Sequence, residues 1–184
     1  MKYVFISGGT GSLGEILVKQ IMYNIPGVSH IVLLVRRNHD ISHICEQFPN
    51  VKISMFILDI SNENEVASVL SKYKNKEIFL FHLAGVLSDG YMYNMTPHVF
   101  SDTLQPKIHG AIGLYKGLSE INCQIKYAIL FSSIYSIFGY DQLSHYSAAN
   151  GYLNGLCKYL NNIGVPTLSV NWGAWDTVGM ASRL

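Results

Sequence analysis

The order of hydrophobic and polar residues along the chain predicts six β-strands. Six short runs are rich in Val, Ile, Leu, Phe and Tyr and show little polar alternation, as expected for strands covered on both faces of a parallel sheet. These runs are KYVFISG (2–8), HIVLLV (30–35), VKISMFILD (51–59), EIFLFHLAG (77–85), IKYAILFSS (125–133) and VPTLSVNW (165–172). The sequence therefore predicts one sheet whose strands are mostly parallel.

The segments between these runs carry apolar residues at helical spacing. They include residues 14–24, 62–73, 97–118 and 145–156. Asn62 is placed to cap one of these helices and Pro97 to start another. Alternating strands and helices predict an α/β fold with a doubly wound parallel sheet, as in the Rossmann fold. Such a sheet binds its ligand at the carboxyl ends of the strands.

Composition narrows the class of protein. The chain has 184 residues, of which 49% are hydrophobic and 14% charged, enough for one domain with a sizeable core and unlike a disordered chain. The formal net charge of +1 gives no electrostatic case for binding nucleic acid or an anionic membrane. No apolar run reaches the roughly 18 residues that span a bilayer, and the amino terminus does not resemble a signal peptide.

The three cysteines do not indicate a disulfide framework or a metal site. Cys45, Cys123 and Cys157 are odd in number, widely spaced and outside any metal-ligand pattern. This usage is typical of free thiols in a reducing compartment.

A glycine-rich turn joins the first predicted strand to the first helix. Gly9, Gly11 and Gly14 form a G-x-G-x-x-G pattern. Glycine permits the tight turn and the close approach of a pyrophosphate, and the helix amino terminus offers unpaired amides to the phosphates. In this context the pattern predicts a dinucleotide site. Its expected contacts are Gly8, Gly9, Thr10, Gly11, Ser12, Leu13 and Gly14.

The end of the second predicted strand discriminates between cofactors. An acidic residue there would accept a hydrogen bond from the ribose of NAD, but this strand is followed by Arg36 and Arg37. Two guanidinium groups suit the 2′-phosphate of NADP, although they could also be solvated surface residues. Asp59, after the third strand, could touch the adenine edge or merely cap the next helix.

Two hydroxyl groups are placed for proton chemistry on a ketone. Ser133 ends the fifth predicted strand, and Tyr146 follows thirteen residues later on a helical segment. A free tyrosine has a pKa near ~10, so it needs a nearby cation to act as an acid at neutral pH. Four residues after Tyr146 stands Asn150, where the commonest reductases of this kind carry lysine.

Lys107 could supply the missing charge from the preceding long helix. That helix should lie beside the one that bears Tyr146, against the same face of the sheet. Asn150 would then be a hydrogen-bonding partner for lysine, backbone or water. The alternatives are a packed tyrosine with a satisfied hydroxyl and a solvated helix lysine.

Together these motifs resemble the ketoreductase domain of modular polyketide synthases and type I fatty acid synthases, within the short-chain dehydrogenase/reductase superfamily. The resemblance covers nearly the whole chain. SGGTGSLG resembles the family's cofactor loop, LLVRR its NADP-selecting strand end, FHLAGVLSDG the segment flanking the nicotinamide, QPKIHGA its lysine motif, FSSIYSIFGYDQLSHYSAAN its serine–tyrosine–asparagine block and VNWGAW the segment closing over the nicotinamide. Lysine on the earlier helix with asparagine after the tyrosine is characteristic of this family.

The resemblance implies NADPH-dependent reduction of a β-ketoacyl thioester that phosphopantetheine tethers to an acyl carrier protein. Tyr146 would protonate the alkoxide oxygen and Ser133 would orient it, while Lys107 and Asn150 would support Tyr146. The resemblance extends the expected cofactor contacts to Ile60, Ala84, Gly85, Trp172 and Gly173. It further implies a cytoplasmic multidomain synthase, with neighbouring domains as partners and without a catalytic metal.

Two positions bear on the configuration of the product. Family members that give the D-hydroxyl tend to carry a leucine–aspartate–aspartate motif, and this chain has Leu87, Ser88 and Asp89. Members that give the L-hydroxyl tend to carry tryptophan eight residues before the tyrosine, where this chain has Phe138. The D-alcohol is therefore expected.

The resemblance also indicates that residues 1–184 form a single catalytic domain cut from a larger synthase. Family domains normally add an amino-terminal structural half, and a lid and a last strand after the position of VGMA. Two other classes stay open: an inactive nucleotide-binding or scaffolding module, and a free-standing short-chain dehydrogenase or sugar-nucleotide epimerase. The presence of Ser133, Tyr146, Lys107 and Asn150 argues against the first, and Asn150 in place of lysine against the second.

Overall fold

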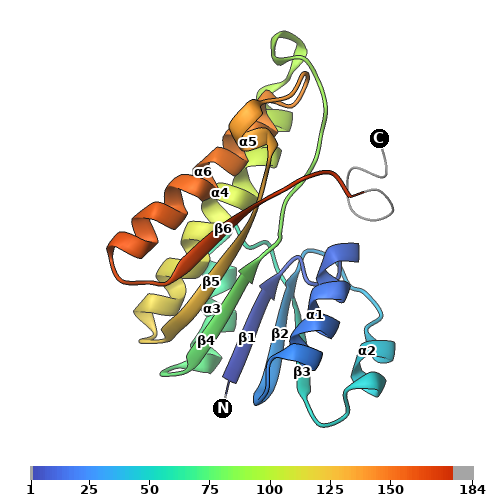
Figure 1. The fold of residues 1–184 in the computed structure, drawn as a ribbon, viewed down its shortest axis with the longest axis vertical. Helices are drawn as coiled ribbons and strands as arrows, with labels where there is room; N and C mark the ends of the chain where they lie inside the picture. Colours follow the sequence, from blue (N-terminus) through green and yellow to red (C-terminus); the bar gives the residue numbers. More distant parts are fainter. Residues whose placement is uncertain (1, 176–184) are drawn as a thin grey trace.

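A computed structural model describes residues 2–175 and places six parallel strands in one sheet. The strand order is β3-β2-β1-β4-β5-β6 (Figure 1). The strands are β1 (Lys2–Ser7), β2 (Val28–Val35), β3 (Lys52–Ile57), β4 (Glu77–His82), β5 (Gln124–Ser133) and β6 (Thr167–Trp172). All six predicted strands and the doubly wound parallel sheet are confirmed.

Helices cover the sheet from both sides. They are α1 (Ser12–Asn24), α2 (Ser42–Gln47), α3 (Glu63–Leu70), α4 (Pro97–Glu120), α5 (Tyr135–Phe138) and α6 (Ser144–Asn162), with short 3₁₀ turns η1 (Ser71–Tyr73) and η2 (Met92–Asn94). In Figure 1, α1 and α2 lie on one face, and α3, α4 and α6 lie on the other. The sequence did not predict α2 or α5, because helices of six and four residues are too short to show a hydrophobic period.

The burial of β1 explains why its sequence is apolar without interruption. Successive side chains of a strand point to opposite faces of a sheet. Phe5 packs into a cluster with Leu34 and Leu114, whereas Val4 and Ile6 belong to a second cluster on the opposite face. Both faces of the central strand are therefore buried, as the absence of alternating polar residues in its sequence indicates.

The two predicted helix starts are confirmed. The Asn62 side chain accepts hydrogen bonds from the backbone N–H groups of Asn64 and Glu65 and so caps α3. Pro97 is the first residue of α4, and the Thr96 hydroxyl caps that helix by accepting from the N–H of Val99. These caps satisfy amides that have no partner within the helix.

The sheet order creates a switch point between β1 and β4. Strand β1 is followed by β2 on one side, while β4 pairs on its other side, so the connections leave in opposite directions. A crevice forms at such a point, outside the carboxyl ends of the strands.

Among the residues described, no helix is both long and apolar enough to cross a bilayer.

The glycine turn between β1 and α1 is packed against itself. Gly8 has φ +74, a conformation that favours glycine, and a Cβ on Gly14 would lie 2.5 Å from the carbonyl carbon of Gly9. Backbone atoms cannot rotate away as a side chain can. The close approach of Gly14 to Gly9 therefore fixes the turn that points toward the crevice.

Gly14→Ala is expected to lower the free energy of unfolding by about 1–3 kcal/mol, the usual cost of overpacking. Gly11→Ala is the matched control, because Gly11 has an ordinary φ of −74 and its Cβ would meet only the Gly8 carbonyl oxygen, at 3.5 Å. Urea denaturation of both variants measures the difference. Equal stability of the two variants would show that the close contact at Gly14 does not constrain the turn.

Candidate active site

A cavity of about 470 Å³ opens at the carboxyl ends of the strands. Residues that follow each of the six strands line it, together with residues of α4 and α6. This is the place where a doubly wound sheet holds its ligand. The predicted nucleotide-binding and proton-transfer residues can therefore be located relative to one cavity.

The glycine loop forms one end of the cavity. Gly8, Gly11, Ser12, Leu13 and Gly14 line it, whereas Gly9 and Thr10 do not. Gly9 instead lies over the sheet, where a Cβ would come within 2.7 Å of Leu33 Cδ2. Thr10 is buried. Gly9 thus packs against the sheet and does not line the cavity.

The loops after β2 and β3 present opposite charges. Arg36 lines the cavity and Arg37 does not, and both side chains are exposed. Asp59 lines it too, but its Oδ1 accepts hydrogen bonds from the N–H and the hydroxyl of Ser61, at 2.9 and 2.6 Å. Hydrogen bonding from Ser61 lowers the pKa of Asp59, and the positive charge of Arg36 adds to this effect. Asp59 thus orders the turn before α3, while Asn62 makes the cap.

Lys107, Ser133 and Tyr146 converge at the other end of the cavity. They come from α4, β5 and α6 respectively. The Lys107 side chain is directed into the protein: it is 2% exposed, its Nζ lies 6.0 Å from the ring centre of Tyr146, and it donates to the Phe131 carbonyl oxygen at 2.8 Å. The cation therefore lies beside the phenol.

Burial affects both ionisable groups. Burial lowers the pKa of Lys107 to about 8. Burial also raises the pKa of Tyr146, while hydrogen bonding to the side chains of Asn150 and Ser133 opposes that rise. At neutral pH the phenol therefore keeps its proton, as an acid must, and most of the lysine stays charged.

The Ser133 hydroxyl is held in one orientation. Its Oγ accepts a hydrogen bond from the backbone N–H of Tyr135 at 3.3 Å. Because this contact uses a lone pair, the hydroxyl proton stays free to donate to another oxygen. Ser133 can thus present a donor to a carbonyl group in the cavity.

Asn150 lies beneath the cavity rather than in its wall. It is fully buried, and its Nδ2 donates to the Tyr146 backbone carbonyl at 2.8 Å. The Ser132 hydroxyl donates in turn to the Asn150 carbonyl at 3.0 Å. Asn150 therefore fixes the helical turn of Tyr146, and Ser132 ties that turn to β5. The Asn150 Oδ1 is buried and has no partner among the described residues.

The surroundings of Lys107 make room for a cation. A Cβ on Gly85 would lie 2.8 Å from Lys107 Cε, so a larger residue there would displace the end of the lysine side chain. His82 is fully buried and its Nδ1 lies 2.8 Å from the Ser7 hydroxyl. Burial and the nearby Lys107 charge lower the pKa of His82 to about 3. The imidazole is therefore neutral at physiological pH and does not repel the ammonium.

The remaining predicted residues divide into two groups. Leu87 lines the cavity, as do the expected cofactor contacts Ile60, Ala84, Gly85, Trp172 and Gly173. Asp89 and Phe138 do not line it; Asp89 is exposed and Phe138 is 79% exposed. The structure thus does not bring Asp89 and Phe138 together with Ser133 and Tyr146.

Sequence reasoning missed other residues of the cavity wall. Tyr135, Leu143 and Trp175 line the cavity, and none was singled out. Trp175 stands in the quoted VNWGAW segment and could have been included. No sequence motif predicts that Tyr135 and Leu143 line the cavity, because their positions depend on how α5 and α6 turn back over the sheet.

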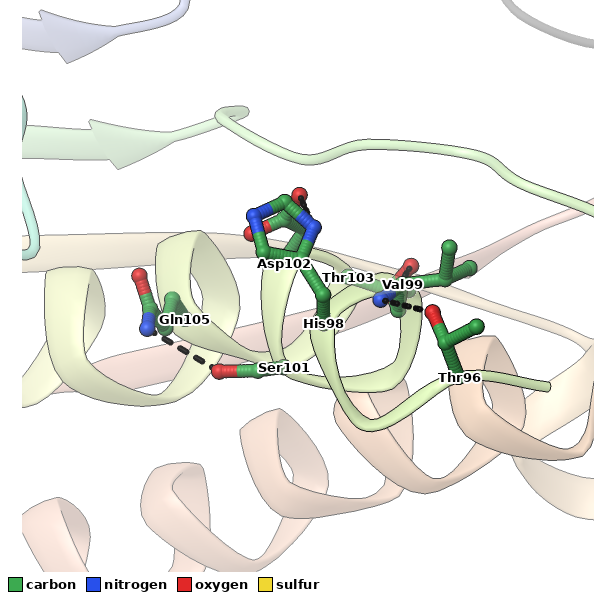
Figure 2. A network of polar contacts seen from close by, with 7 residues as sticks. All are labelled: Thr96, His98, Val99, Ser101, Asp102, Thr103 and Gln105. Carbon is green, nitrogen blue, oxygen red and sulfur yellow. Dashed lines mark hydrogen bonds and ion pairs between the residues drawn. The ribbon is translucent and has the colours of Figure 1, made fainter.

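A polar network borders the cavity at the start of α4 (Figure 2). His98 Nδ1 lies 3.0 Å from Asp102 Oδ2, and Gln105 donates to the Ser101 hydroxyl at 3.0 Å. Asp102 and Gln105 both line the cavity. These contacts fasten polar side chains two to nine residues before Lys107, at the rim of the cavity.

The residues present fit a dinucleotide cofactor. The glycine turn offers backbone without side-chain obstruction, Arg36 offers a cation, and the Trp172 Nε1 is a buried donor with no partner in the described part of the chain. A dinucleotide would bind its phosphates at such a turn and with such a cation, and it could accept a hydrogen bond from the free donor. Within residues 2–175 no group of three or more metal-ligating side chains lies together.

Comparisons with known proteins agree with this geometry. A family model described as the KR domain matches residues 3–177. The chain is 30% identical over 188 residues to polyketide synthase GfsB from Streptomyces halstedii, covering 100% of this chain and 3% of that protein. It is 30% identical to the pikromycin polyketide synthase component PikAII from Streptomyces venezuelae, covering 98% of this chain and 5% of that protein.

A solved structure extends the similarity to three dimensions. The first ketoreductase of the tylosin PKS superposes with a TM-score of 0.86 at 27% identity, covering 98% of this chain and 40% of that one. The chain therefore spans a small part of its curated relatives and less than half of this solved relative. The similarity covers both the glycine turn and the segment with Tyr146.

The buried ammonium makes a testable contribution to stability. The folded-state pKa of Lys107, about 8, lies below its unfolded value of 10.5, so burying the charge opposes folding below pH 8. That cost disappears as Lys107 loses its proton between pH 8 and 10.5. The stability advantage of Lys107→Met over the wild type should fall across this window, by on the order of 3 kcal/mol.

Urea denaturation of both proteins at several pH values between 7 and 10.5 measures this change. Lys158→Met is a matched control, because Lys158 is exposed on α6. A constant difference between Lys107→Met and the wild type would mean that the ammonium is hydrated in the folded state.

Proposed function

Because this chain belongs to the KR domain family, the ketoreductase domains of modular polyketide synthases, we propose that it reduces a β-ketoacyl thioester to the β-hydroxyacyl thioester with NADPH. The observation that carries the proposal is the convergence of Lys107, Ser133 and Tyr146 on one cavity. The three side chains come from different elements, and their meeting supports a shared chemical task.

In this proposal two hydroxyl groups bind the ketone oxygen. The Ser133 proton is free to donate to that oxygen, since its Oγ already accepts from Tyr135. Tyr146 donates a second hydrogen bond and then transfers its proton to the oxygen as negative charge develops there. Bound NADPH would supply the hydride that reduces the ketone carbon.

Lys107 stabilises the tyrosinate that remains after this transfer. Its ammonium lies beside the ring of Tyr146 in a site with little water, where charge interactions are stronger than in bulk solvent. Asn150 holds the helical turn of Tyr146 and thereby limits the motion of the phenol. Asn150 is thus a positioning residue in this reaction.

The preference for NADPH rests on Arg36. Its side chain lines the cavity beyond the glycine turn, where the adenosine end of a dinucleotide would lie, and a guanidinium pairs with a phosphate dianion. Asp59 also lines the cavity, but Ser61 engages its Oδ1 and commits that oxygen to the turn before α3. Arg37 could add a second contact only by turning toward the cavity.

The substrate is proposed to be tethered by phosphopantetheine to an acyl carrier protein, with residues 1–184 acting as one catalytic domain beside the other domains of a synthase. Support comes from the relatives, which are many times longer than this chain. An inactive nucleotide-binding module is the competing function. The retained set of Ser133, Tyr146, Lys107 and Asn150 favours an enzyme.

Tyr146→Phe tests this function. Removing the proton donor should lower turnover by about 10²–10⁴-fold with an acetoacetyl N-acetylcysteamine thioester, because general acid catalysis contributes that much. Consumption of NADPH and of NADH is followed by absorbance, and NADPH should be preferred. Tyr159→Phe is the control, since Tyr159 lies on the same helix but is 53% exposed. Full turnover of Tyr146→Phe would remove Tyr146 from the chemistry.

The product is expected to have the D-configuration. This expectation rests on Leu87, which lines the cavity, and on the absence of tryptophan at position 138. The exposed position of Asp89 indicates that it would act only if substrate extended beyond the cavity. Chiral chromatography of the hydroxyacyl product measures the ratio, and a product that is mainly the L-alcohol would contradict the expectation.

A further inference from the structure

The wall of the cavity beside Tyr146 contains a second tyrosine. Tyr135 is the first residue of α5, two residues after Ser133, and lines the same cavity as Ser133 and Tyr146. The two phenols are close enough that Tyr135 contributes, after burial, to the raised pKa of Tyr146. A large aromatic ring therefore stands next to the position where a ketone oxygen would bind.

The Tyr135 residue has contacts through both its backbone and its ring. Its backbone N–H is bound to the Ser133 hydroxyl, and its ring packs against Tyr140 with centroids 4.7 Å apart and planes at 34°. An aromatic contact of this kind contributes about 0.5–1.5 kcal/mol and favours this orientation of the ring, with the Tyr140 ring itself 61% exposed. The Tyr135 ring thus has a preferred position in the cavity wall.

The short helix that carries Tyr135 is fastened on two sides. The Ser136 hydroxyl donates to Asn171 Oδ1 on β6 at 3.0 Å and accepts from Asn154 Nδ2 on α6 at 2.8 Å. The N–H of Ile134 donates to the Trp172 carbonyl oxygen at 2.9 Å. The backbone at Tyr135 is therefore anchored to both neighbouring elements and resists outward displacement.

The reaction geometry places substrate atoms against this wall. A ketone oxygen must come within about 2.6–3.2 Å of the hydroxyls of Ser133 and Tyr146 to receive a proton. The two carbons bonded to the ketone carbon then lie within a few ångströms of those hydroxyls. Tyr135 flanks the same place, and the buried side chain of Leu143 makes the adjoining wall apolar.

We propose that Tyr135 is a specificity-determining residue whose ring favours acyl chains unbranched at the carbons next to the ketone. This inference rests on the proposed ketone reduction. An extra methyl group at either carbon meets a ring that its packing and the anchored helix hold in place. The ring volume, rather than the phenolic hydroxyl, makes the selection.

The test compares three thioesters of N-acetylcysteamine with the full chain: acetoacetyl, 2-methylacetoacetyl and 4-methyl-3-oxopentanoyl. Tyr135→Ala should raise kcat/KM for at least one branched substrate, relative to acetoacetyl, by about tenfold or more, the discrimination that even one methyl group allows in a packed pocket. The 2-methylacetoacetyl group adds one methyl group and the 4-methyl-3-oxopentanoyl group adds two. Tyr135→Phe should keep the wild-type ratio, because it retains the ring. Tyr159→Ala, the same substitution at an exposed site, should also keep it.

The outcomes separate the inference from the proposed function. An unchanged ratio in Tyr135→Ala, with reduction of acetoacetyl thioester retained, overturns the role of Tyr135 alone. A shift in Tyr135→Phe as large as in Tyr135→Ala overturns the steric account. No reduction of any of the three substrates by wild-type protein that still binds NADPH overturns the proposed function and the inference with it.

The Tyr135→Leu variant keeps the test decisive if the Tyr135→Ala variant does not fold. It removes the flat ring but keeps an apolar side chain, and quenching of tryptophan fluorescence by NADPH reports whether each variant retains its fold. A folded Tyr135→Leu variant with a ratio shifted toward a branched substrate supports the inference, and a folded one with the wild-type ratio contradicts it.

Discussion

The burial of the Lys107 ammonium is the interaction on which the arrangement of the site depends. Removing a charge from water is costly, so every element around it has to compensate. The Phe131 carbonyl on β5 accepts a hydrogen bond from the ammonium, Gly85 leaves space for the lysine side chain, and His82 stays neutral beside it. The strand ends, the long helix α4 and the phenol of Tyr146 are thereby positioned around one cation.

The same constraint explains how lysine and asparagine divide the work. A lysine on α6 would reach the phenol along its own helix, whereas Lys107 reaches it from the neighbouring one. The position on α6 is then available to Asn150, which binds the Tyr146 carbonyl and receives the Ser132 hydroxyl on its own carbonyl. Lys107 on α4 supplies the charge, and Asn150 on α6 restricts the position of Tyr146.

The turn from β5 to α5 links the chemistry to substrate shape. Ser133 and Tyr135 are separated by one residue, so the hydroxyl that orients a ketone and the ring beside it move as one unit. Ser136, the next residue along, fastens that unit to α6 and β6 through Asn154 and Asn171. Rigidity of this kind is what allows a binding site to discriminate by size, since a mobile wall would give way.

The architecture and the chemical groups of the site can be predicted from the sequence. Uninterrupted apolar runs identify strands that are buried on both faces, and the glycine spacing after the first strand identifies the turn, because these features depend on local geometry. The motifs also paired Lys107 with Tyr146 across two helices. They could not rank residues within a motif: Gly9, Thr10 and Arg37 match the pattern but do not line the cavity.

The meeting of particular side chains, in contrast, follows from the folded arrangement of segments that are distant in sequence. Whether Lys107 turns inward depends on Gly85 and on a carbonyl of β5, which are 22 and 24 residues away along the chain. The role of Tyr135 depends on a four-residue helix that has no hydrophobic period and is held by side chains of α6 and β6. The physical reason is that burial and packing depend on segments distant in sequence, whereas hydrophobic periodicity and turn conformation depend on residues close together in the chain.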